Sequence, residues 1–125
     1  MNTDDGRLDS VTRTVIGCAY RVANTLGCGF LEKVYENALA HEIRRAGLLA
    51  QQQCQIEVLY DDIVVGEYVA DLLIEKCVLV ELKAAKSLER VHLAQCLNYL
   101  KGSNLRVCLL INFGTPKVQV KRISS

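Results

Sequence analysis

Three charged residues interrupt two of the most apolar segments of this chain. Asp71 lies in VADLLI, and Glu81 and Lys83 lie in CVLVELKA. Both segments are rich in Val, Leu and Ile and are predicted to be strands. A charge inside such a strand is costly unless it is paired or binds something. The three residues, in a D-x9-E-x-K pattern, are therefore the first candidates for a functional site.

A three-residue loop at positions 75–77 connects these segments and suggests how they pair. If the loop centres on Lys76, position 74 pairs with 78, and Asp71 lies opposite Glu81. Side chains alternate along a strand, so Lys83 shares the face of Glu81. Opposed like charges destabilise a sheet. The hairpin therefore predicts a cation between the two acids, and a divalent metal ion is the simplest candidate.

Metal-assisted cleavage of a phosphodiester would use residues of these types. Asp71 and Glu81 offer the carboxylate oxygens that Mg²⁺ or Mn²⁺ prefers, and the backbone carbonyl of Leu82 offers a further oxygen. Lys83 could orient or deprotonate water, or stabilise charge in the transition state. The alternative is an edge hairpin with one solvated face and an ordinary Glu81–Lys83 pair. The pattern alone leaves both interpretations open.

A predicted helix over residues 88–101, capped by Ser87, carries a second group of candidates. His92, Gln95 and Tyr99 follow the spacing i, i+3 and i+7, which places them on one helix face. Gln and Tyr side chains make useful contacts with phosphate or another ligand. A polar surface stripe with Tyr99 half buried explains the same spacing.

Two further acids, Glu32 and Glu36, lie one turn apart on a helix predicted over residues 30–46. Either could add a carboxylate to a metal site. A solvated helix face is the alternative, because Glu32 in the first turn also interacts well with the helix dipole. The buried stripe of this helix is expected to comprise Leu31, Val34, Tyr35, Ala38, Leu39 and Ile43.

The remaining elements follow from the periodicity of apolar residues. A loose leader is expected over residues 1–9, followed by a helix at 10–26. Strands are predicted at 53–60, 63–74, 78–84, 105–112 and 117–123. The order α-α-β-β-β-α-β-β predicts an α/β (or α+β) fold, with a single domain over residues 10–125 whose central strands are enclosed by helices.

Composition agrees with one globular domain. The chain has 125 residues, of which 50% are hydrophobic and 23% charged. No apolar run approaches the ~20 residues of a membrane span, and the polar, acidic N-terminus is not a signal peptide. Six scattered cysteines suggest reduced thiols in the cytoplasm, with a disulfide or zinc framework as the alternative. The net charge of +1 argues against a strongly basic nucleic-acid coat.

Several segments together resemble the GxxExxY protein family, which is placed in the PD-(D/E)xK nuclease superfamily. They are GFLEKVY at 29–35, GEYVADLLIE at 66–75, VLVELKA at 78–84, HLAQCLNYL at 92–100 and LLINFG at 109–114. The resemblance covers about residues 10–123. It implies a restriction-endonuclease-like mixed sheet flanked by helices, and Mg²⁺-dependent (or Mn²⁺-dependent) cleavage of DNA or RNA.

The resemblance also implies a role for each candidate residue. Glu32 corresponds to the helix acid, with Glu36 as the alternative, and Asp71 to the strand acid. Glu81 and Lys83 correspond to the E-x-K motif. The residue before Asp71 is Ala70 rather than the proline of the superfamily name. The pair at positions 95 and 99 looks like the Q-x-x-x-Y motif of RecB-type exonucleases, and the residues expected to position the substrate are Gln95, Tyr99, Tyr35 and His92.

Two functions of different classes remain open at this stage. One is a nuclease; the other is a non-catalytic module that binds nucleic acid or a protein partner on the same fold, which suits the small size and near-neutral charge. A homo-oligomer that builds its groove between subunits is a further possibility.

Overall fold

The computed structural model describes residues 3–125 and contains a five-stranded mixed sheet in the order β1-β2-β3-β4-β5. β3 and β4 are parallel, and the other neighbours are antiparallel. The predicted α/β fold and its element order are confirmed. The elements are α1 (Thr3–Leu26), α2 (Glu32–Arg45), β1 (Ala50–Tyr60), β2 (Ile63–Ile74), β3 (Val78–Lys83), α3 (Arg90–Ser103), β4 (Val107–Asn112) and β5 (Gln119–Ser124).

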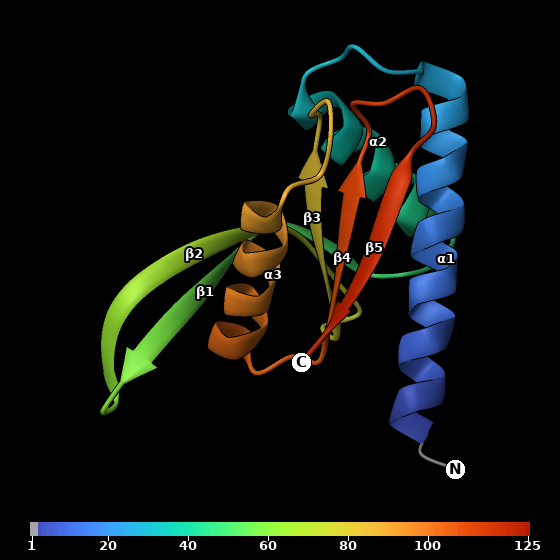
Figure 1. Ribbon diagram of the computed structural model, residues 1–125. Helices are drawn as coiled ribbons and strands as arrows, with labels where there is room; N and C mark the ends of the chain where they lie inside the picture. The colour runs from blue at the N-terminus through green and yellow to red at the C-terminus, as the bar shows by residue number, and fades with distance from the viewer. Residues whose placement is uncertain (1–2) are drawn as a thin grey trace.

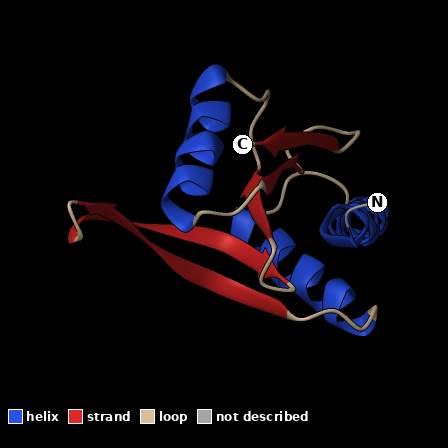
Figure 2. Ribbon diagram, turned by 90° about the horizontal axis from the view of Figure 1, so that it is seen from below, coloured by secondary structure: helices blue, strands red, loops and turns tan. Residues whose placement is uncertain are grey.

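Helices cover both faces of the sheet, with α1 and α2 on one side and α3 on the other (Figures 1 and 2). Each side has its own hydrophobic core, since Leu72, Val80 and Leu82 pack with α1 and α2, whereas Leu79 and Leu110 pack with α3. Every residue of β4 is buried. Burial on both faces explains why β3 and β4 are nearly continuous apolar runs.

The β1–β2 hairpin extends beyond the rest of the sheet (Figure 1). Its turn is formed by Asp61 and Asp62, whose φ angles of 51° and 62° are those of a tight hairpin turn. Large apolar side chains at the tip are exposed, including Tyr60 at 70% and Ile63 at 64%. Only the base of this hairpin is therefore enclosed by the two cores.

The β2–β3 hairpin has the predicted register. Ile74 pairs with Val78, so the turn is centred on Lys76. The paired positions end at Leu72 and Val80, one step before Asp71 and Glu81 would pair. The two acids therefore lie where β2 and β3 separate.

The loose leader predicted over residues 1–9 is wrong for residues 3–9, while residues 1–2 lie outside the described part of the chain. α1 begins at Thr3 rather than at Ser10. Leu8 is buried in the core, and Arg7 donates to Glu75 at 3.4 Å. These contacts with distant segments stabilise a first stretch of helix that is polar by itself.

Two helix predictions also require correction. Leu31 was expected in the buried stripe, but it precedes the first turn of α2 and is 80% exposed; Val34 is also exposed. Ser87 does not cap α3, because the helix begins at Arg90 with Glu89 as its N-cap. Glu89 and His92 form a reciprocal capping box that sets this later start.

The six cysteines are free thiols: Cys18, Cys96 and Cys108 are buried, Cys54 and Cys77 are partly buried, and Cys28 is exposed. Among residues 3–125, no helix has both the length and the apolar character needed to cross a membrane.

Candidate active site

The carboxylates of Asp71 and Glu81 replace backbone partners at the point where β2 leaves β3. The Asp71 N–H donates to Glu81 Oε1 at 2.9 Å, and the Leu82 N–H donates to Asp71 Oδ2 at 2.8 Å. Strand alternation also breaks here, because Ala70 packs with the α3 core and Leu72 with the α1–α2 core. This break holds two acids side by side at the end of a sheet ladder.

Burial makes both acids resist ionisation. It raises the pKa of Glu81 from 4.5 to about 8, with the Asp71 charge acting in the same direction. Burial also raises the pKa of Asp71, while the Leu82 N–H and the Lys83 charge oppose the shift. A cation between the carboxylates would favour their charged forms.

Pairing with β4 determines the direction of the neighbouring groups on β3. The Phe113 N–H donates to the Lys83 carbonyl at 2.8 Å, so Lys83 presents its backbone to β4. Consecutive residues of a strand present their backbone groups to opposite sides. The carbonyl of Leu82 is therefore directed toward the β2 side, where its own N–H meets Asp71.

A buried asparagine fixes the chain just after Lys83. Asn112 Oδ1 accepts a hydrogen bond from the Ala85 N–H, and its Nδ2 donates to the Ala85 carbonyl, both at 3.0 Å. Asn112 is an amide residue at the end of an otherwise apolar strand, and this pattern, which could have indicated a structural role, was not recognised in the sequence. Asn112 thus anchors the end of β3, which carries Lys83.

The two acids of α2 have different surroundings. Glu36 is 4% exposed, and its carboxylate accepts from Lys33 at 3.0 Å, Gln52 at 2.7 Å and Gln53 at 2.6 Å. Glu32 is exposed in the first turn, and partial burial of its carboxyl raises its pKa, with Lys83 lowering and Asp71 raising it. Glu32 therefore lies close enough to Asp71 and Lys83 to sense their charges, and its carboxylate has no hydrogen bond within residues 3–125, whereas Glu36 is held by Lys33 and two amides.

Gln52 and Gln53 are functional candidates that the sequence analysis missed. Gln53 has a φ of 55°, unusual for a non-glycine residue in a strand. Its side chain donates to Glu36 and lies 3.5 Å from Asp71 Oδ1. The run of glutamines at 51–53 was the available signal. These side chains connect the α2 acid to the strand acid.

The GFLEKVY segment forms the loop that leads into α2. Gly29 has a φ of 112°, which strongly favours glycine. Tyr35 is fully buried, donates to the Gly27 carbonyl at 2.6 Å and accepts from the Phe30 N–H at 3.2 Å. Its ring stacks on Phe113 at 4.7 Å. Because it has no exposed surface, we assign Tyr35 to holding this loop, and with it Glu32, rather than to touching a substrate.

Tyr35→Phe is expected to lower the free energy of unfolding by about 1–3 kcal/mol, because the Gly27 carbonyl and the Phe30 N–H lose a shared partner. Urea denaturation measures the change. The matched control is Tyr20→Phe on α1, whose side chain is 42% exposed and should have little effect. Equal stability of the two variants would contradict this role of the Tyr35 hydroxyl.

α3 adds polar groups beside the acids. Gln95 donates to the Tyr99 hydroxyl at 3.0 Å. Burial raises the pKa of Tyr99 to about 12, and the charges of Glu81 and Asp71 add to the effect, so this hydroxyl keeps its proton. His92 Nδ1 accepts from the Glu89 N–H at 3.0 Å, which directs the other ring nitrogen away from the cap. His41, by contrast, is exposed on α2.

The oxygen donors fit a hard divalent cation. Mg²⁺ typically binds one or two protein carboxylates and completes its shell with water and substrate phosphate. Asp71, Glu81 and the Leu82 carbonyl supply such a set. Burial raises the pKa of each acid, and a bound cation would oppose that shift. As the side chains of residues 3–125 lie, no three His, Cys, Asp or Glu residues are arranged to hold an ion by themselves. Water and phosphate would have to complete the shell.

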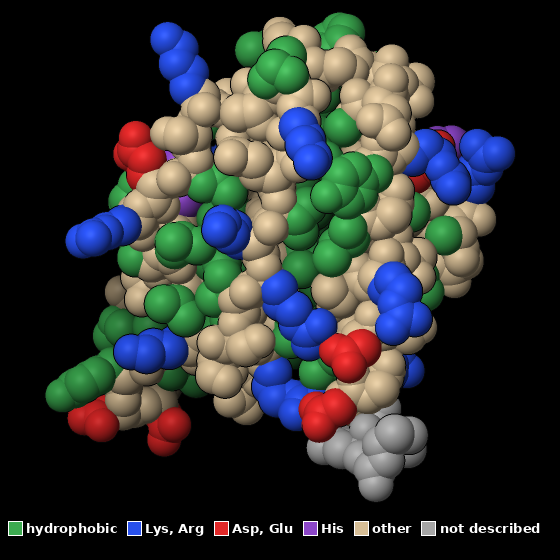
Figure 3. Space-filling model, turned by 45° about the vertical axis from the view of Figure 1, so that its right-hand side comes forward, with side chains coloured by type: hydrophobic (Ala, Val, Ile, Leu, Met, Phe, Trp, Pro, Cys, Tyr) green, Lys and Arg blue, Asp and Glu red, His purple; other side chains and the backbone are tan. Residues whose placement is uncertain are grey.

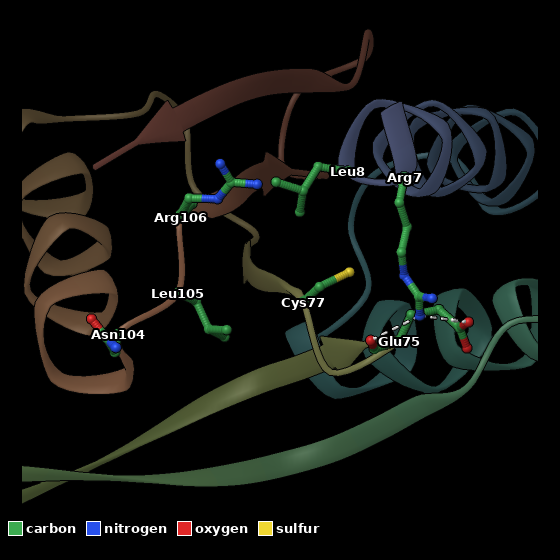
Figure 4. Close-up of a pocket in the computed structure, with 7 residues that line it drawn as sticks. All are labelled: Arg7, Leu8, Glu75, Cys77, Asn104, Leu105 and Arg106. Atoms are coloured by element: carbon green, nitrogen blue, oxygen red, sulfur yellow. Dashed lines mark hydrogen bonds and ion pairs between the residues drawn. The ribbon is translucent and has the colours of Figure 1, made fainter. Parts of the chain in front are cut away.

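Among residues 3–125, two other surfaces lack a comparable group of cation ligands beside a free lysine or arginine. A cavity of about 440 Å³ lies at the opposite ends of β3 and β4 (Figure 4). Its arginines are already committed, since Arg7 pairs with Glu75 and Arg106 with Asp5. On the face shown in Figure 3, Lys and Arg side chains are spread between apolar ones rather than gathered into one strip. The acid group at the end of β3 is therefore the strongest candidate site.

Comparison with known families agrees with this geometry. A model of the PD-(D/E)XK nuclease superfamily matches residues 9–123. The chain belongs to the PD-(D/E)XK nuclease superfamily. The match includes Glu32, Asp71, Glu81, Lys83 and the α3 residues. No curated protein matches the chain.

A solved structure with a similar fold is that of an alkaline exonuclease, LHK-Exo, from Laribacter hongkongensis. The TM-score is 0.51 at 14% sequence identity, over 85% of this chain and 75% of that one. At this identity the similarity concerns the fold. It confirms that the mixed sheet and its flanking helices form a nuclease-like arrangement.

Proposed function

We propose that this protein is a metal-dependent nuclease that hydrolyses phosphodiester bonds of DNA or RNA with Mg²⁺ or Mn²⁺. The observation that carries the proposal is the pair of buried carboxylates where β2 leaves β3, with Lys83 beside them. Membership of a nuclease superfamily supports the reaction class. The substrate is nucleic acid because the group combines cation ligands with a lysine that suits phosphate.

Each residue has a distinct role in this proposal. Asp71, Glu81 and the Leu82 carbonyl hold the metal ion, which supplies charge neutralisation at the phosphate and an activated water. Glu32 adds a carboxylate from α2, and Gln53 and Glu36 position Asp71. Lys83 donates from its ammonium to the water or to a phosphate oxygen. Gln95, Tyr99 and His92 position the substrate strand.

Metal titration with a charge-removing variant tests the site directly. Calorimetry with Mn²⁺ is expected to show binding to the wild type and at least about tenfold weaker binding to Asp71→Asn. Asn keeps the size of the side chain and an oxygen that can accept from the Leu82 N–H. The control is Asp62→Asn at the hairpin tip, which makes the same chemical change outside the site and should leave binding intact.

The titration should be repeated with a short oligonucleotide present, since phosphate often completes the metal shell. Equal metal affinity of wild type and Asp71→Asn under both conditions would contradict the metal site. Oligonucleotide binding by a wild type that cleaves no substrate in the presence of metal would instead favour the non-catalytic binding module, for which the net charge of +1 remains the motivating observation.

We further propose that the chain is a GxxExxY-type member of the superfamily. The three residues in the family name each have a physical role. Gly29 adopts the positive φ of the loop, Glu32 carries a carboxylate toward the site, and Tyr35 holds the loop before α2 through its hydroxyl. A cytoplasmic location, suggested by six free thiols, and assembly into a homo-oligomer or with a protein partner belong to the same proposal. Light scattering at high concentration tests the homo-oligomer.

A further inference from the structure

A groove runs between the β1–β2 hairpin and α3 and opens beside the candidate active site. The part near the site, of about 330 Å³, is lined by Tyr68 of β2 and by His92, Gln95 and Asn98 of α3. An adjoining hollow of about 510 Å³ shares Tyr68 and Asn98 and continues to Lys101. The groove therefore starts at the residues assigned to the substrate strand and leads away along α3.

Tyr68 forms an aromatic platform in the middle of this groove. Its side chain is 40% exposed, and its ring centroid lies 5.2 Å from that of Tyr99, which is buried. The packed Tyr99 ring supports Tyr68 from one side, while the exposed part of Tyr68 can accept a planar group. Aromatic rings of this kind stack on nucleobases, and each stacked base contributes substantially to affinity.

The groove also offers polar groups suited to the edge of a base. Asn98 and Gln95 carry side-chain amides, each with a donor and an acceptor. Amide groups read the exposed edges of unpaired bases. The combination of one ring and two amides resembles a base subsite more than a purely apolar docking groove.

The charges that line the groove are compatible with the binding of a phosphate backbone. Among the lining residues in the described chain there is no carboxylate, and Lys101 contributes a positive charge. Tyr68 pairs with Ile56, which packs in the α3 core, so this pair faces α3. The next pair, Glu57 and Glu67, therefore points to the opposite face of the hairpin.

We propose that this groove binds single-stranded nucleic acid, with one base stacked on Tyr68 and the strand leading from Lys101 toward the acids. This inference rests on the proposed nuclease function and names its substrate form. Inside a duplex, both faces of each base are covered by its neighbours, so stacking on Tyr68 within a strand requires an unpaired base. The preferred substrate is therefore single-stranded, or a strand end that has separated.

A fluorescence experiment reports on the groove without needing cleavage. The chain contains no tryptophan, so Tyr68→Trp introduces the sole one. In an Asp71→Asn background with metal chelated, oligothymidylate or oligouridylate of about ten nucleotides should quench this fluorescence, and the matching duplex should not. Tyr60→Trp at the hairpin tip is the control, and its fluorescence should not change.

Kinetics on the wild-type background provide the second measurement. Tyr68→Leu keeps an apolar contact with Tyr99 but removes the stacking surface, so KM for a single-stranded oligonucleotide should rise roughly tenfold with kcat little changed. A thermal melt verifies folding. An unchanged KM of Tyr68→Leu would contradict the proposal that this groove binds the substrate strand. Quenching of Tyr60→Trp as strong as that of Tyr68→Trp would contradict it as well.

The two proposals fail in distinguishable ways. Cleavage by the wild type without quenching at Tyr68→Trp would overturn the groove and leave the nuclease standing. Quenching by the single strand in a protein whose wild type cleaves no substrate would support the groove and overturn the nuclease.

Discussion

Lys83→Ala is expected to lower kcat for metal-dependent cleavage by at least about 100-fold while the protein stays folded. The lysine lies beside two carboxylates and supplies positive charge where the phosphate must be stabilised. The backbone of Lys83 pairs with β4 whatever its side chain, so the strand should survive the substitution. Initial rates with Mg²⁺, read alongside circular dichroism, measure the effect.

Two further variants make this result interpretable. Lys86→Ala removes an exposed lysine three positions along the chain and should retain most activity. Lys83→Arg keeps the charge but changes its geometry, so activity between those of wild type and Lys83→Ala is expected. Full activity of Lys83→Ala, or loss of activity only together with loss of the fold, would remove Lys83 from the mechanism.

The metal-free protein is expected to lose stability as the pH rises from about 5 to about 8. Burial raises the pKa of Glu81 from 4.5 to about 8, so between these values the folded state holds a proton that the unfolded state has released. Stability is therefore fully present below the unfolded pKa and falls as the pH approaches the folded one. Each pH unit in this window contributes at most about 1.4 kcal/mol from this group.

Thermal melts across this pH range, with metal chelated, measure the decline. Glu81→Gln cannot ionise, so its melting temperature should vary much less with pH. Glu67→Gln, an exposed glutamate on β2, should follow the wild type. Mn²⁺ should restore the stability of the wild type near pH 8, because a metal ion replaces the missing proton. Rising stability of the metal-free wild type over this window would contradict the burial of an uncompensated Glu81.

Local patterns predicted much of the fold and of the site. The alternating apolar segments and the short loop at 75–77 were enough to predict the β2–β3 register, with Ile74 opposite Val78. The same reasoning placed Asp71 directly opposite Glu81 in the ladder. The ladder instead ends one pair earlier, at Leu72 and Val80, and the two carboxylates join the strands beyond it by hydrogen bonds to backbone N–H groups. These features depend on near neighbours in the sequence, and strand periodicity describes such neighbours well.

The missed features depend on contacts between distant segments. The αL conformation of Gln53 is maintained where β1, β2 and α2 meet, and no β1 pattern indicates it. Glu36 is buried because two glutamines from β1, together with Lys33, donate hydrogen bonds to its carboxylate. Tyr35 has the same helical periodicity as the core, yet its hydroxyl holds a loop eight residues away. In each case, contacts with residues outside the local sequence pattern determine the conformation or the burial of the side chain.

Where β2 leaves β3, two backbone N–H groups donate to side-chain carboxylates rather than to strand carbonyls, and these two N–H groups can serve as spectroscopic probes of the site. The amide protons of Asp71 and Leu82 lie against the very oxygens that would bind a cation. In a ¹⁵N–¹H correlation spectrum, these two resonances should move together when the acids lose a proton or gain an ion. Occupancy of the site can therefore be followed in the unmodified protein, without a substrate, a mutation or a label on a side chain.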